Sequence, residues 1–102
     1  STANCRNDQL IRQIETAHQA NTELIAETAA KMDTLVQLRN RINIQGRALT
    51  TEEIEKVEAI NQLEQRWLAA KDFLPPIDSL PKTQKGKKAA LQKQETYRNG
   101  LL

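Results

Sequence analysis

The eleven residues from Gln45 to Glu55 constrain the fold most, because they end one helix and begin another within a few positions. Gly46 is the residue type that closes a helix, since it enters the left-handed backbone conformation without a Cβ clash. Thr50 and Glu53 have the spacing of a capping box, in which each side chain accepts a hydrogen bond from the other residue's backbone N–H. A helix end so close to a helix start predicts two antiparallel helices, an αα-hairpin.

Apolar residues recur at steps of three and four on both sides of this turn, which is the period of an amphipathic helix. The first helix is expected over about residues 7–45 and the second over about 51–74. Pro75 and Pro76 end the second helix, because neither ring can donate the next helical hydrogen bond. A weaker third helix is expected over about 84–98. The predicted fold class is therefore all-α, either a three-helix bundle or a dimeric helical bundle.

The length of 102 residues predicts a single helical domain over 1–102. Within it, residues 75–82 are expected to form a Pro-rich connector, and residues 83–102 a basic C-terminal helix or tail. The core must be aliphatic, since the sequence holds only three aromatic residues: Trp67, Phe73 and Tyr97.

The length of the first helix has a consequence for the surface of the molecule. If the hairpin turns near residues 47–48, facing residues have numbers that add to about 95. This register places Thr28 opposite Trp67, Lys31 opposite Glu64, and Asn21 opposite Leu74. Upstream of Asn21 several turns of the first helix stay uncovered. Burying each large aliphatic side chain there is worth roughly 1.5–3 kcal/mol, so either the chain after Pro75 or another molecule must cover them.

A contact between the start of the first helix and the C-terminal segment is therefore the leading functional hypothesis. The sequence predicts a non-enzymatic protein–protein interaction or assembly module, adaptor, chaperone-like or regulatory, that binds a partner helix or itself. The residues expected to form this contact are Leu10, Ile11, Ile14, His18, Leu91 and Tyr97. Long Gln- and Glu-rich hairpins of this kind resemble small helical secretion chaperones and assembly factors in composition, without a shared motif.

The charge is unevenly distributed along the chain, which raises an alternative. Residues 1–81 carry nine Lys and Arg against twelve Asp and Glu, whereas residues 82–102 carry six against one. Such a basic segment can bind phosphates, so the alternative is a nucleic-acid accessory protein. Its anion-binding residues would be Lys82, Lys85, Lys87, Lys88, Lys93 and Arg98. The stretch from Lys82 to Lys88 contains no interleaved aromatic residue for base stacking, so a nucleic acid is possible but not favoured.

Few residues suggest other chemistry. His18 is the only histidine and Cys5 the only cysteine, so neither a disulfide within the chain nor a metal site of two thiolates is expected. The single cysteine leans towards the cytoplasm. No catalytic motif, cofactor-binding motif or membrane-spanning run is found. Asn21 and Thr28 interrupt the apolar seam of the first helix, where they either fix the register or oligomeric state of the helices or line a small-molecule pocket.

Overall fold

The computed structural model describes residues 2–102, apart from the side chain of residue 3. It contains three helices: α1 (Thr2–Asn43), α2 (Thr51–Lys71) and α3 (Gln84–Leu101). All three pack against each other, and the described residues contain no strand. The all-α fold with a hairpin and a third helix is thus confirmed.

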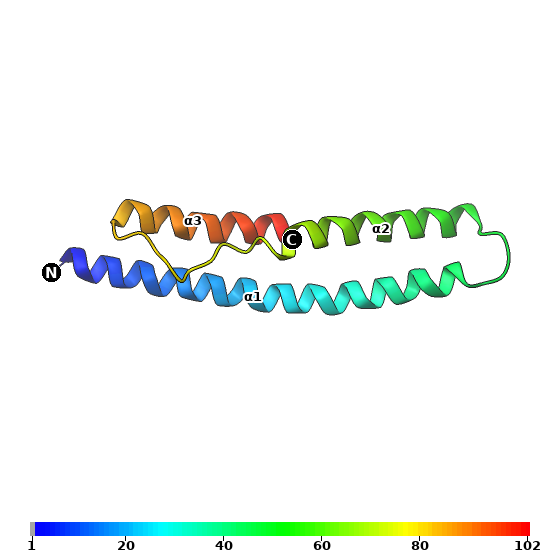
Figure 1. Cartoon of the computed structure of the whole chain (residues 1–102), viewed down its shortest axis with the longest axis horizontal. Coiled ribbons are helices and arrows are strands. Elements are labelled where there is room, and N and C mark those ends of the chain that lie inside the picture. The colour runs from blue at the N-terminus through cyan, green and yellow to red at the C-terminus, as the bar shows by residue number, and fades with distance from the viewer. Residues whose placement is uncertain (1) are drawn as a thin grey trace.

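The helices form a rod that measures 71 × 18 × 17 Å. Helix α2 runs antiparallel to the second half of α1, as the hairpin predicts, and α3 runs parallel to the first half (Figure 1). Helices α2 and α3 therefore follow one another along α1, and their C-terminal ends meet near the middle of the rod. A helix with its side chains is about 10–12 Å wide, so the rod is two helices thick.

The helix ends differ from the sequence expectation by a few residues. Helix α1 begins at Thr2 rather than near residue 7, because nothing in the segment before Asn7 breaks a helix. Helix α2 ends at Lys71, earlier than expected, with Asp72 as its C-cap. Helix α3 continues to Leu101, which shows that Gly100 is tolerated inside its last turn.

The turn between α1 and α2 has the predicted local structure. Gly46 has a φ of 71°, in the left-handed region. The Thr50 hydroxyl accepts from the Glu53 N–H at 3.2 Å, and the Glu53 carboxylate accepts from the Thr50 N–H at 2.9 Å. Both bonds of the capping box are therefore present, and they set the direction in which α2 leaves the turn.

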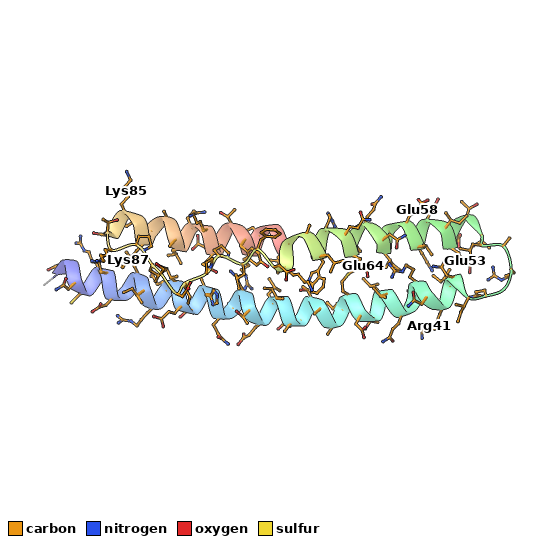
Figure 2. All side chains as sticks on the ribbon, in the orientation of Figure 1. Arg41, Glu53, Glu58, Glu64, Lys85 and Lys87 are labelled. Carbon is orange, nitrogen blue, oxygen red and sulfur yellow. The ribbon has the colours of Figure 1, made fainter. Side chains whose placement is uncertain are left out.

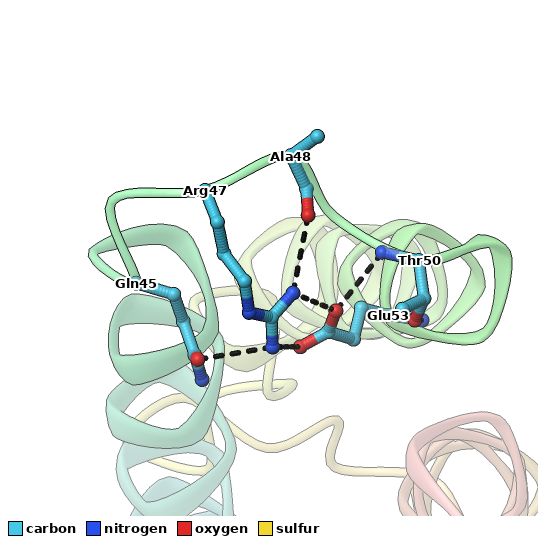
Figure 3. A network of polar contacts seen from close by, with 5 residues as sticks. All are labelled: Gln45, Arg47, Ala48, Thr50 and Glu53. Atoms are coloured by element: carbon cyan, nitrogen blue, oxygen red, sulfur yellow. Dashed lines mark hydrogen bonds and ion pairs between the residues drawn. The ribbon is translucent and has the colours of Figure 1, made fainter.

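Arg47 adds a second set of bonds to this turn (Figure 3). Its guanidinium donates to both carboxylate oxygens of Glu53, at 2.8 and 3.0 Å. It also donates to the Gln45 side chain and to the carbonyl oxygen of Ala48. One arginine thus ties two points of the loop to the first turn of α2.

The start of α1, which α2 cannot reach, is covered by the chain itself. Leu10 and Ile14 are buried there, and Ile14 has no exposed surface. Helix α3 lies along this segment, and the connector between α2 and α3 passes over it (Figure 1). The buried apolar core continues through the other half of the rod at Leu24, Met32, Ile42 and Ile60.

The hairpin register is confirmed at one pair and corrected at another. The Trp67 indole N–H donates to the Thr28 hydroxyl at 2.8 Å, as facing residues should. Glu64, however, pairs with Arg39 at 2.9 Å and not with Lys31. Helical side chains lean towards the N-terminus of their own helix. In an antiparallel pair the Arg39 and Glu64 side chains therefore lean together, whereas those of Lys31 and Glu64 lean apart.

Candidate functional site

The six residues expected to bind a partner do not form one open surface. Leu10 and Ile14 belong to the internal core between α1 and α3. Leu91 lines a shallow groove between these helices, while His18 lies in another hollow beside Ile77 of the connector. Ile11 is half-buried. The chain thus uses much of this region to hold its own third helix.

Tyr97, the sixth of these residues, joins the facing ends of α2 and α3. Its hydroxyl lies 3.0 Å from the carbonyl oxygen of Ala70 and 3.3 Å from that of Lys71. These carbonyls lie in the last turn of α2, where intrahelical donors run out. Burial, and to a lesser extent the charge of Asp72, raises the pKa of Tyr97 above its usual value. The phenol therefore stays protonated and able to donate to these carbonyls.

The basic segment contributes fewer free cations than the sequence suggests. Lys87 is only 6% exposed, and its ammonium donates to the carbonyl oxygen of Lys82 at 2.8 Å. Figure 2 shows Lys87 on the inner side of α3, whereas Lys85 points away from the rod. The remaining members are exposed, but helical spacing distributes those of α3 around its circumference. They therefore form no continuous basic stripe.

Asn21 links α1 to α3 and to the connector. Its side-chain amide donates to the backbone oxygen of Gln94 at 2.9 Å and to the side-chain oxygen at 3.0 Å. The Gln94 amide in turn donates to the carbonyl oxygen of Pro75 at 2.7 Å. Asn21 and Gln94 are each 1% exposed. Of the two roles considered for Asn21, the structure supports the one in which it sets the register of packed helices.

Thr28 aligns two packed helices and also borders a pocket. It accepts the hydrogen bond from Trp67 that aligns α1 with α2. It also lines a pocket of about 240 Å³, which lies where the ends of α2 and α3 meet the middle of α1. We call this the junction pocket. Its lining comes from all three helices and the C-terminal residue: Thr28, Lys31, Met32, Leu35, Leu63, Arg66, Trp67, Ala70, Gly100, Leu101 and Leu102.

The hairpin half of the rod also has exposed apolar side chains on a side of α2 away from the junction pocket. Ile54 is 44% exposed and Leu68 is 48% exposed. They are 14 residues apart, close to four whole turns, so they share one side of α2. Val57 lies near the same line and is half-buried. We call these three residues the open face.

The junction pocket and the open face lie on different sides of α2. Leu63, which lines the pocket, is nine residues from Ile54, and nine residues make two and a half turns. Asn61 lies between Ile54 and Leu68 on the open face, where its side-chain oxygen accepts from Arg39 at 2.8 Å. The Arg39–Glu64 ion pair is thus at the edge of this face, and Figure 2 shows Glu64 between the two helices.

The open face was not predicted as a site from the sequence, and of the junction pocket only Thr28 was considered as a pocket residue. The junction pocket is lined by Trp67 and Leu101, which are far apart in the chain. The lengths of the helices could have predicted that the ends of α2 and α3 meet. Helix α3 has 18 residues, which is about 27 Å, and the stretch of α1 beyond the reach of α2 is about 30 Å long. A helix of that length covers the remaining part of α1 and reaches the end of α2.

Several other kinds of site find no support within residues 2–102. The described side chains contain no group of three His, Cys, Asp or Glu residues placed to hold a metal ion. Cys5 is exposed and unpaired. None of the described helices combines the length and the hydropathy that crossing a membrane requires.

The chain was compared with protein-family models, curated proteins and solved structures. No protein-family model, no curated protein and no solved structure matches this chain.

Proposed function

We propose that this chain is a non-enzymatic helical assembly module, and that its open face packs against the open face of a second copy. The observation that carries the proposal is the exposure of Ile54 and Leu68 on one side of a hairpin only two helices thick. Large apolar side chains that are exposed along one side of a helix favour an interaction there.

A second hairpin would supply the cover that this half of the rod lacks. Two αα-hairpins packed face to face make a four-helix bundle, in which apolar rows of each pair fill a common core. Each large aliphatic side chain removed from water contributes roughly 1.5–3 kcal/mol. Burial of Ile54 and Leu68 from both copies therefore contributes favourably to the free energy of association.

The charges beside the open face suit a symmetric partner. Arg39 and Glu64 place one positive and one negative group at its edge. In a twofold dimer the same surface of both copies meets, so that if one residue contacts a second residue of the other copy, the reverse contact is present as well. We place the twofold axis beside this ion pair, so that Arg39 of each copy lies near Glu64 of the other and the interface is complementary in charge to itself. The proposal keeps the interaction role expected from the sequence and moves its surface, since Ile14 is enclosed within the chain.

The test is the solution mass of the chain across a wide concentration range, measured by light scattering. We expect a dimer in the native protein and a monomer of unchanged helicity in the double variant Ile54→Glu/Leu68→Glu. The matched control, Ala59→Glu/Gln62→Glu, adds the same charge at exposed positions on another side of α2 and should remain dimeric. A native protein that stays monomeric up to millimolar concentration would overturn the proposal.

A further inference from the structure

The junction pocket combines an apolar interior with a positively charged rim. We infer that it binds a small amphipathic anion, meaning a single acyl chain or ring that carries one negative charge. This binding site is separate from the open face, because the two lie on different sides of α2. It does not depend on the proposed self-association.

The interior of the pocket suits hydrocarbon. Met32, Leu35 and Leu63 form its walls between α1 and α2, and Leu101 closes the end at which α3 arrives. The one polar group of the Trp67 ring is already used, since its N–H donates to Thr28 at 2.8 Å. An apolar chain that enters the pocket therefore leaves no indole donor without a partner.

The rim of the pocket provides positive charge from two helices. Lys31 of α1 and Arg66 of α2 both line it and both are exposed. Neither forms an ion pair with any carboxylate of the described residues, and Glu64 is paired with Arg39 instead. None of the side chains that line the pocket is acidic. A ligand with a negative head and an apolar body is therefore complementary to both parts.

The size of the pocket restricts the ligand to a small one. About 240 Å³ is below the roughly 300–1,000 Å³ typical of sites for drug-sized molecules. This space holds one chain or one ring rather than a branched lipid. Trp67 lines the pocket and is the only tryptophan of the chain. Its fluorescence therefore reports directly on whether the pocket is filled.

The experiment is a titration of the whole chain with dodecanoate and with dodecyltrimethylammonium, each kept below the concentration at which it forms micelles. These probes share a twelve-carbon alkyl length and differ in the sign of the head-group charge. We expect dodecanoate to produce a saturable change in Trp67 fluorescence, with an affinity about tenfold higher than that of the cation. The preference should shrink as salt is added, since salt screens exposed charges.

Two sets of variants locate the binding. Lys31→Gln/Arg66→Gln should abolish the preference for the anion while the chain remains folded. Gly100→Leu should fill the pocket and reduce dodecanoate binding at least tenfold. Gly100→Ala is its matched control, because a Cβ added there meets no atom within 4 Å, and it should still bind. Circular dichroism checks that each variant keeps its helices.

Three results would overturn the inference. The first is an absence of saturable binding by dodecanoate. The second is equal affinity of the native chain for the anionic and the cationic probe. The third is unchanged dodecanoate binding in a folded Gly100→Leu variant, which would place the ligand elsewhere. The mass of the native chain is measured separately, so failure here leaves the self-association proposal standing, and failure of that proposal leaves the pocket intact.

Discussion

Glu53 illustrates how much one side chain contributes to the hairpin turn. Its carboxylate lies in the first turn of α2. There it accepts from the backbone N–H of Thr50 and from the guanidinium of Arg47. The partial positive charge of a helix N-terminus also favours a carboxylate. These bonds, led by that from Arg47, lower the pKa of Glu53 from 4.5 to about 2.

Acid should therefore weaken the turn over a defined range of pH. Because the pKa of Glu53 is lower in the folded chain than in the unfolded one, its stabilisation is complete above about pH 4.5 and is lost as the pH falls towards about 2. We expect Glu53→Gln to be less stable than the native chain at pH 6, and the difference in melting temperature to vanish near pH 2.

Thermal unfolding followed by circular dichroism measures this difference at each pH. Glu55→Gln, which removes a neighbouring carboxylate that forms no ion pair with the described residues, is the control and should show a smaller difference from the native chain at pH 6. A difference between native chain and Glu53→Gln that is constant from pH 6 to pH 2 would contradict the prediction.

At the scale of the element, the glycines at the two ends of α3 have different surroundings, crowded at Gly86 and open at Gly100. A Cβ at Gly86 would lie 2.5 Å from the Cβ of Pro81 and 2.9 Å from the hydroxyl oxygen of Thr83. That hydroxyl caps the helix by accepting from the Gly86 N–H at 3.0 Å. Gly86 thus allows the connector to approach the start of α3, whereas Gly100 at the other end borders open space.

Alanine at these two positions should therefore have effects of opposite sign. Gly100→Ala should raise the free energy of unfolding by about 0.5–1 kcal/mol, because alanine loses less backbone entropy in a helix. Gly86→Ala should lower the free energy of unfolding, because the clash with Pro81 displaces the connector or the cap. Urea unfolding of both variants tests this pair. Equal effects of the two substitutions would show that the close contact at Gly86 has no consequence.

At the scale of the whole molecule, the placement of α3 depends on polar contacts between segments far apart in the chain. Asn21 of α1 bonds Gln94 of α3, which bonds the carbonyl oxygen of Pro75 in the connector. The Asn21 side-chain oxygen has no hydrogen-bond partner among the described residues. Tyr97 then joins α3 to the end of α2. These contacts specify one register for a helix with a thin apolar stripe.

A double-mutant cycle at Asn21 and Gln94 tests this role. Each single substitution by leucine leaves buried polar groups without partners and should cost about 1–3 kcal/mol. The double variant Asn21→Leu/Gln94→Leu should cost less than the two single changes together, since both side-chain partners are removed. Chemical unfolding gives the coupling energy. Additive effects, with no coupling, would mean that the bond between these side chains does not hold α3 in place.

Local signals accounted for the parts of the fold that depend on neighbouring residues. Gly46, Thr50 and Glu53 predicted the turn because helix ending and capping involve atoms only a few residues apart. The facing of Thr28 and Trp67 followed from the position of the turn alone. The pairing of Lys31 with Glu64 was predicted wrongly, because position along the helix was considered without the direction in which each side chain leans.

The sequence by itself determined the three helices, the hairpin and the need to cover the start of α1, because periodicity and capping act within a few turns. Only the tertiary structure decided what covers it. Helix α3 fills that place, so Ile14 becomes core while Ile54 and Leu68 stay exposed. The junction pocket likewise exists only because the ends of α2 and α3 meet beside α1. Burial and pockets arise from contacts between distant residues, which no local pattern contains.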